Sequence, residues 1–264
     1  MEGNFESIKN VLYNEASELV NSSAMFKALR AKEKIDVDIP KEFAEKFFKI
    51  IDKVNLSLME EKDNFYGYFL FQMGREIRFD INSPTGINFK GAKYIIYFNP
   101  IIFLQLNIKQ MESTIKHEIH HVLSMHLARA KELRGKFSTL AINLAMDIVV
   151  NQYLNNLPPY ATTLKGVNLK YELNLEPYNS FEYYAENIQN VLNVLEESDE
   201  GEEDDSWGEE LENGYDPETT HDLWDESENI DEKTLRDFTE KFISNSEKGV
   251  IPIHIEGMID SLKK

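Results

Sequence analysis

The 264-residue chain contains no cysteine. This absence excludes disulfides, thiolate metal sites and cysteine nucleophiles, so a transition-metal site here has to be built from histidine, aspartate and glutamate. Basic residues are also scarce, with 28 Lys and Arg against 47 Asp and Glu, which gives a formal net charge of −19. Because such a chain repels phosphate backbones, we expect no nucleic-acid binding.

Long apolar runs are missing as well. The most apolar stretch, YIIYFNPIIFLQLNIK (94–109), is interrupted by Asn99 and Pro100 and is too short to span a bilayer. The first residues, MEGNFESIKN, have neither the basic start nor the apolar run of a signal peptide. Hydrophobic residues make up 42% of the chain, which is enough for a buried core. We therefore expect a globular, cytoplasmic protein without membrane contact.

The negative charge is concentrated in one segment. Between Glu196 and Glu218 there are 13 acidic residues and no basic one, so the rest of the chain carries only −6. The few apolar residues of this segment cannot offset the entropy of ordering it, which predicts a mobile acidic loop within a single domain spanning 1–264. Such a loop could dock a basic protein partner. An acidic DNA mimic is disfavoured, because its charge would be spread over a folded surface.

Apolar residues at three- and four-residue spacing predict helices at 4–20, 39–54, 109–134, 138–154, 179–195 and 231–246. Two strands are predicted, EIRFDI (76–81) and AKYIIYF (92–98), with PTGINF (84–89) as a turn between them. Gly135 is the expected end of the helix that starts at 109. This order predicts an α+β fold that is predominantly helical, with a small sheet.

The predicted helix 109–134 carries the stretch STIKHEIHHVLSMH (113–126), which contains four histidines and one glutamate. Since a helix turns by about 100° per residue, His117 and His121 lie on one face, one turn apart, with Glu118 beside them. This HExxH spacing is typical of a metal site whose glutamate acts as a general base. The alternative is a helix whose polar face happens to carry imidazoles.

The other two histidines of this stretch are not expected to bind the same metal. His126 is nine residues past His117 and lies on the opposite side of an unbroken helix. A glycine turn followed by a ligand, as in metzincins, is also excluded, because Ser124 and Leu127 occupy those positions. His120 points to another side and is expected to be a supporting or partly exposed imidazole.

The third ligand is expected on the next helix. In NLAMDIVVN (143–151), Asp147 is flanked by apolar residues, and a lone buried carboxylate needs a compensating partner. A cation held by the two histidines would be such a partner. Asn143 and Asn151 lie on the same stripe and would orient the carboxylate or the histidines. The alternative is a polar stripe on the helix surface.

These motifs resemble the "putative metallopeptidase domain" family of bacteria and phages, whose members often precede a von Willebrand A-like domain. Matching blocks are YFNP, HEIHHVLSMHLAR, INLAMDIVVNQYL, SFEYYAENI, HDLWDE and KGVIPIHIEGMI, in that order along the chain. The resemblance implies a zincin-like fold with zinc bound by His117, His121 and Asp147. Because the chain ends at Lys264, we expect no A-like domain in it.

Three protein ligands would leave a fourth position for water, as in catalytic zinc sites. The hypothesis is therefore a zinc metallopeptidase that hydrolyses peptide bonds by a zinc-activated water, with Glu118 as general base. His221, oriented by Asp222 or Asp225, is the candidate donor to the oxyanion. The strand predicted at 92–98 could pair with an extended peptide substrate.

A second hypothesis is a catalytically silent, zinc-stabilised binding or regulatory protein whose acidic loop docks a basic partner. The fourth ligand position separates the two hypotheses. Solvent or an inhibitor at that position favours an enzyme, and a fourth protein side chain favours a structural site.

Overall fold

The computed structural model describes residues 2–20, 25, 28, 35, 37–60, 64–197, 217, 220–226 and 231–262. The acidic loop predicted between Glu196 and Glu218 falls almost entirely outside these residues. Its mobility therefore stays a prediction.

The described helices, in chain order, are α1 (Glu2–Leu19), α3 (Lys41–Glu60), α4 (Phe65–Gln72), α5 (Pro100–Phe103), α6 (Ile108–Leu123), α7 (His126–Leu133), α8 (Thr139–Asn151), α9 (Leu164–Lys170), α10 (Phe181–Glu197), the 3₁₀ helix η2 (Asp222–Glu226), α12 (Glu232–Ser246) and α13 (Ile253–Leu262). The strands are β1 (Gly74–Ile77), β2 (Thr85–Lys90) and β3 (Lys93–Phe98). The predicted α+β class with helix dominant is confirmed. Within the described ranges, no helix has both the length and the apolar character needed to cross a bilayer.

The three strands form one mixed sheet in the order β1-β3-β2. β1 runs parallel to β3, and β2 runs antiparallel to it. The prediction of a turn at 84–89 was wrong, because this segment is β2. The turn lies instead at Gly91 and Ala92, which both have a φ of 59°, as the tight hairpin that joins β2 to β3 requires.

This topology also corrects the expectation that the strand at 92–98 pairs with a substrate. β3 is the central strand, and its two edges are taken by β1 and β2. β2 is an outer strand of the sheet, and it contacts α6. An extended peptide that pairs with the sheet beside α6 would therefore lie along β2.

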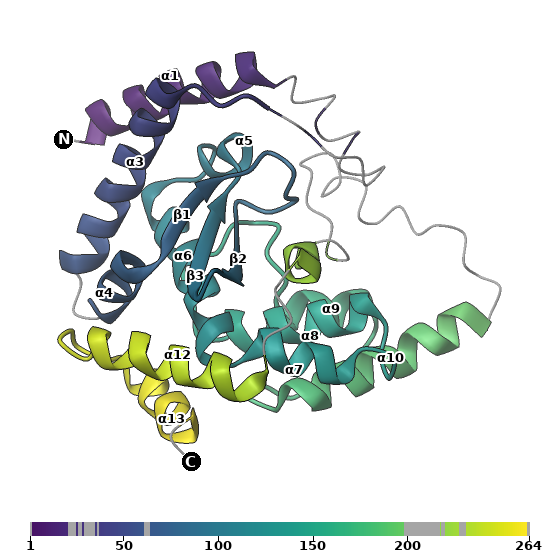
Figure 1. Cartoon of the computed structure of the whole chain (residues 1–264). Helices are drawn as coiled ribbons and strands as arrows, with labels where there is room; N and C mark the ends of the chain where they lie inside the picture. Colours follow the sequence, from purple (N-terminus) through teal and green to yellow (C-terminus); the bar gives the residue numbers. More distant parts are fainter. Residues whose placement is uncertain are drawn as a thin grey trace.

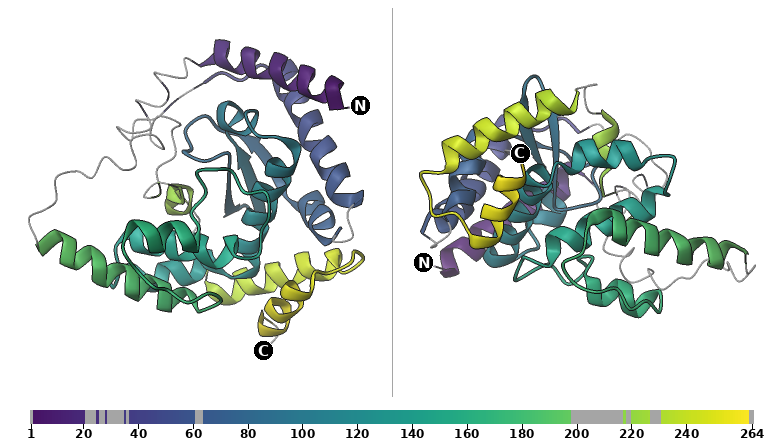
Figure 2. Two further views of the ribbon diagram at one scale, coloured as in Figure 1. Left: turned by 180° about the vertical axis from the view of Figure 1, so that it is seen from behind. Right: turned by 90° about the horizontal axis from the view of Figure 1, so that it is seen from below.

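Two clusters of buried side chains lie on either side of α6 and α8. In Figure 1, α1 and α3 lie to one side of the sheet and α7 to α10 to the other, and the view from behind in Figure 2 shows the same separation. The first cluster contains Phe47, Phe98 and the apolar face of α6. The second contains Tyr184 and the apolar face of α8. Helices α6 and α8 contact each other, so polar residues at their contact lie between the two clusters.

The single helix predicted at 109–134 is broken into α6 and α7. Met125, between them, has a φ of 54°, in the left-handed region that a methionine rarely adopts. Its side chain is buried, and Thr239 of α12 contacts its sulfur at 3.7 Å. Packing thus holds a break that no glycine or proline marks in the sequence.

Candidate metal centre

Two histidines of α6 point to the same spot. The helix begins with a capping box formed by Asn107 and Gln110, and Ile115 on its apolar face is fully buried. This fixes the rotation of the helix about its axis. His117 and His121, one turn apart, then bring their Nε2 atoms to 2.9 Å from each other.

Asp147 of α8 lies next to both rings. Ser138 caps the start of α8 by accepting a hydrogen bond from the backbone of Ala141. The Asp147 carboxylate is buried, and its Oδ1 lies 3.5 Å from His117 Nε2 and 3.4 Å from His121 Nε2. The structure therefore brings together the three residues that the sequence named as metal ligands.

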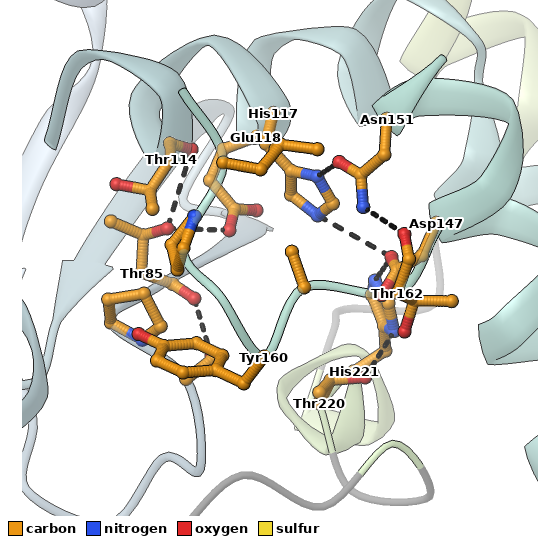
Figure 3. Close-up of a pocket in the computed structure, with 15 residues that line it drawn as sticks. Thr85, Thr114, His117, Glu118, Asp147, Asn151, Tyr160, Thr162, Thr220 and His221 are labelled. Atoms are coloured by element: carbon orange, nitrogen blue, oxygen red, sulfur yellow. Dashed lines mark hydrogen bonds and ion pairs between the residues drawn. The ribbon is translucent and has the colours of Figure 1, made fainter. Parts of the chain in front are cut away.

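His221, immediately before η2, completes the cluster. Its Nε2 lies 3.5 Å from Asp147 Oδ1 and 3.3 Å from His121 Nε2 (Figure 3). One ligand atom from each of the four residues can be chosen such that all lie within 4.8 Å of one another. The sequence expected His221 at the site, but as a donor to the substrate and not as a fourth ligand.

The Asp147 carboxylate gives a direct test of whether these residues fit a metal. Its Oδ1 is buried, and no hydrogen bond reaches it from the described residues. Three imidazole nitrogens surround it at 3.4–3.5 Å, too far for good hydrogen bonds. A buried acceptor without a donor is costly, and a cation shared by the four side chains removes that cost. The donor set of three imidazoles and one carboxylate therefore fits a metal ion.

Each imidazole of the cluster is held through its second nitrogen. His117 Nδ1 lies 2.8 Å from Asn151 Oδ1, and Asn151 Nδ2 donates to the carbonyl of Thr162 at 2.7 Å. His221 Nδ1 lies 3.0 Å from Thr220 Oγ1. Such contacts fix the ring orientation and the tautomer of metal-binding histidines. Asn151 thus orients a histidine, as its place on the α8 stripe suggested.

The other expected supporting groups lie differently. Asn143 Nδ2 donates to the carbonyl of Pro217 at 3.0 Å, and so contacts the chain shortly before His221. Of the two carboxylates expected to orient His221, Asp222 is exposed, and the side chain of Asp225 lies outside the described residues.

His126 was expected to face away from the site; it lies outside the four-residue cluster but against one of its members. Because the helix breaks at Met125, His126 begins α7, and its Nδ1 lies 2.8 Å from Nδ1 of His121. His126 is fully buried and holds His121 from the side opposite the cluster. It therefore contacts one member of the four-residue cluster without belonging to it.

His120 was expected to be a supporting or a partly exposed imidazole, and its complete burial excludes the second alternative. Its Nε2 lies 2.8 Å from the hydroxyl of Tyr66, which is also 3.3 Å from Nε2 of His254 in α13. The rings of His120 and His254 are stacked, with centroids 5.3 Å apart. This group connects α13 and α4 to the face of α6 that carries His120.

Glu118 lies in the same cleft as His117 and Asp147. It is buried, and its Oε1 accepts a hydrogen bond from Thr85 Oγ1 at 2.9 Å. Burial raises the pKa of Glu118 to about 7, although the charge on His117 and the Thr85 hydrogen bond oppose the shift. A carboxyl group with a pKa near neutrality is suited to take up and release a proton.

The histidines of the cluster differ in charge. Burial lowers the pKa of His117, but Asp147 outweighs this effect and raises the pKa to about 9. For His121, burial and the charge of His117 lower the pKa to about 3. Burial likewise lowers the pKa of His221 to about 4, although Asp147 opposes the shift. At neutral pH the metal-free cluster therefore holds one protonated and two neutral imidazoles.

The cleft is walled by two segments that the sequence did not assign to the site. One is 83–85 at the start of β2, and the other is the loop 157–162, which includes Tyr160 (Figure 3). Thr85 was missed because its segment was interpreted as a turn. The loop 157–162 carries no pattern that indicates a role in the site.

One of the three comparisons with known proteins finds a match. No curated protein and no solved structure matches the chain. A family model described as "Putative metallopeptidase domain" matches residues 58–228, which include all four residues of the cluster and Glu118. Since the match covers more than half of the chain, the protein belongs to this putative metallopeptidase domain family.

Proposed function

We propose that this protein is a zinc-dependent metallopeptidase with a zincin-like arrangement of sheet and active-site helix. In this proposal His117, His121 and Asp147 hold the zinc ion, and Glu118 is the general base. When bound, zinc acts as a Lewis acid that polarises the peptide carbonyl and lowers the pKa of a water molecule. The substrate is a peptide or protein segment, as membership of the family implies.

The observation that carries the proposal is the placement of Glu118. This carboxyl group is buried in the wall of the cleft that His117 and Asp147 also line. Thr85 donates one hydrogen bond to it. A purely structural metal site has no use for a buried carboxyl group that is not a ligand, and burying it costs free energy. In a peptidase, Glu118 takes a proton from the attacking water and delivers it to the leaving amine.

One observation favours the alternative, a zinc-stabilised binding protein. Structural zinc sites have four protein ligands, and His221 supplies a fourth side chain to the cluster. His221 thus has two candidate roles, as a fourth ligand and as the donor to the oxyanion that the sequence suggested. These roles call for different experiments.

The test of the proposed function is Glu118→Gln, which keeps the size of the side chain and removes its basicity. We expect the variant to keep its zinc and its melting temperature and to lose peptide cleavage, measured by mass spectrometry on a peptide library. Glu112→Gln is the matched control, because Glu112 is a second buried glutamate of α6 and pairs with Lys109 at 2.9 Å. Cleavage by Glu118→Gln at the wild-type rate would remove Glu118 from the mechanism.

A further inference from the structure

We propose that His221 is a displaceable fourth metal ligand, carried by a segment that also covers the outer edge of β2, so that the structure is a latent form of the peptidase. This segment is 220–226, which contains Thr220, His221 and η2. The inference rests on the proposed function and concerns its regulation. In this inference, segment 220–226 controls access to the fourth ligand position and also to β2, the strand with which a substrate would pair.

The first argument is the spacing of the ligand atoms. In a tetrahedral zinc site with metal–ligand distances of about 2.1 Å, neighbouring ligand atoms lie about 3.4 Å apart. Asp147 Oδ1 lies 3.5, 3.4 and 3.5 Å from Nε2 of His117, His121 and His221, respectively. His221 Nε2 lies 3.3 Å from His121 Nε2, and the Nε2 atoms of His117 and His121 lie closer together, at 2.9 Å. Four of these five spacings match a shared metal ion, so His221 stands where a fourth ligand would bind.

The second argument is the way the segment covers β2. Trp224 Nε1 donates to the carbonyl of Ile87 at 2.8 Å, and Asn88 Nδ2 donates to the carbonyl of Leu223 at 2.6 Å. Leu223 packs so closely on Gly86 that a Cβ at this glycine would lie 2.6 Å from Leu223 Cδ1. Segment 220–226 is therefore fitted to β2 by its backbone and its side chains.

These contacts occupy groups that an extended peptide would use. The carbonyl of Ile87 points away from β3, toward Trp224, and is thus an outward-facing group of an outer strand. Pairing of a peptide with β2 requires such groups. The Trp224 hydrogen bond has to break before a substrate can pair at Ile87.

The third argument is that His221 has room to withdraw. It lines the cleft that contains Glu118, and it also lines a second cavity of about 310 Å³ bordered by Phe137, Ile142 and Met146. His221 therefore borders both spaces. A movement of His221 into the second cavity would leave His117, His121 and Asp147 in place, because these are held by α6 and α8.

Glu118 distinguishes a latent site from a purely structural one. Its buried carboxyl group faces the same cleft and is not part of the four-residue cluster. If His221 never left, a four-coordinate metal would keep no ligand position for a water molecule beside Glu118. A catalytic site that closes reversibly requires both a fourth side chain at the metal, here His221, and a buried base that is not a ligand, here Glu118.

The inference can be tested without turnover by using the Co²⁺-loaded protein and acetohydroxamate, a small bidentate metal ligand. Cobalt reports its ligands through its visible absorption. In the wild type we expect weak binding of acetohydroxamate, because the open state is a minor one. In His221→Ala we expect the affinity to rise about 10-fold or more, since an open population of a few per cent lowers the apparent affinity by that fraction.

Trp224→Phe is the second variant. It keeps all four side chains of the cluster and removes the hydrogen bond to Ile87, so we expect an intermediate gain in acetohydroxamate affinity. Tyr13→Phe is the control, because this aromatic residue lies in α1 and outside the cluster. It should bind the probe like the wild type. Cobalt content is measured for each variant by elemental analysis.

Two results would overturn the inference. If wild type and His221→Ala bind acetohydroxamate equally well, His221 does not close the ligand position. If His221→Ala loses the metal altogether, His221 is a structural ligand that cannot leave. A His221→Ala protein that gains probe affinity supports the inference even when no peptide is cleaved, and in that case only the peptidase proposal fails.

Discussion

Thr85→Val tests how the cleft sets the protonation of Glu118. Valine has nearly the same shape as threonine, so the substitution removes the hydroxyl that donates to Glu118 Oε1 at 2.9 Å and also lies 3.5 Å from the carbonyl oxygen of Thr114. Thr85 is 3% exposed, so water does not readily replace the lost donor. The hydrogen bond stabilises the charged form of Glu118, and its loss should raise the pKa above the present value of about 7.

The size of the shift follows from the strength of the hydrogen bond. A hydrogen bond to a charged group contributes about 1.5–3 kcal/mol. One pKa unit corresponds to about 1.4 kcal/mol, so we expect a shift of about one to two units if most of this contribution is lost. The Glu118 carboxyl group of Thr85→Val would then be largely protonated at neutral pH and a poor base.

The assay is a pH titration of the metal-free protein labelled with ¹³C in the glutamate carboxyl groups, followed by NMR. The Glu118 signal is assigned by its absence from Glu118→Gln. Thr114→Val is the matched control, because this buried threonine borders the same cleft but donates to the carbonyl of Met111. A midpoint that does not move in Thr85→Val, or that moves equally in Thr114→Val, would refute the reasoning.

Three further predictions concern the metal. Asn151→Leu removes the contact to His117, and His126→Ala removes the contact to His121. Each should weaken zinc binding by about 10- to 100-fold, measured by competition with a chelator. Unchanged zinc affinity in both variants would mean that these imidazole rings need no support. Zinc binding near pH 7.5 should release about one proton, because Asp147 raises the pKa of His117 to about 9, and calorimetry in buffers of different ionisation enthalpy measures this number. The metal-free protein should melt at lower temperature as pH rises from 6.5 toward 9, because the stabilisation from protonated His117 is complete below the ordinary pKa of 6.5 and is lost near 9. The buried Glu118 acts in the same direction between pH 4.5 and 7, since its ionisation destabilises the fold.

Part of the four-residue cluster and Glu118 could be predicted from the sequence, because their placement depends on the local geometry of helices. The angle per residue of a helix places His117, His121 and Glu118 together whatever the rest of the fold does. Asp147 followed from a different argument, the cost of an isolated carboxylate among apolar residues. Both arguments use only one or two helices, and both residue sets meet in the structure at 2.9–3.5 Å.

The errors came from contacts between distant parts of the chain. PTGINF was interpreted as a turn because of its proline and glycine, yet it includes most of β2. Gly86 is required there because Leu223, more than a hundred residues later, packs directly against it. A glycine selected by close packing has the same appearance in a sequence as a glycine selected by a turn, so the pattern could not separate the two.

The role of His126 shows the same limit more sharply. The helical angle correctly keeps this ring out of the four-residue cluster, but the conclusion that it has no part in the site assumed an unbroken helix. Met125 has a left-handed backbone conformation, which turns the chain at this point. Nδ1 of His126 therefore lies 2.8 Å from Nδ1 of His121, on the side of that ring opposite the cluster. All six histidines of the chain then belong to one of two groups: His117, His121, His126 and His221 around Asp147, and His120 with His254 around Tyr66. Both groups lie against α6, so the orientation of this helix depends on α7 and α13 as well as on its own sequence. Three members of the four-residue cluster can be named from patterns on one or two helices, whereas the residues that hold them in place come from elements that only the folded chain brings together.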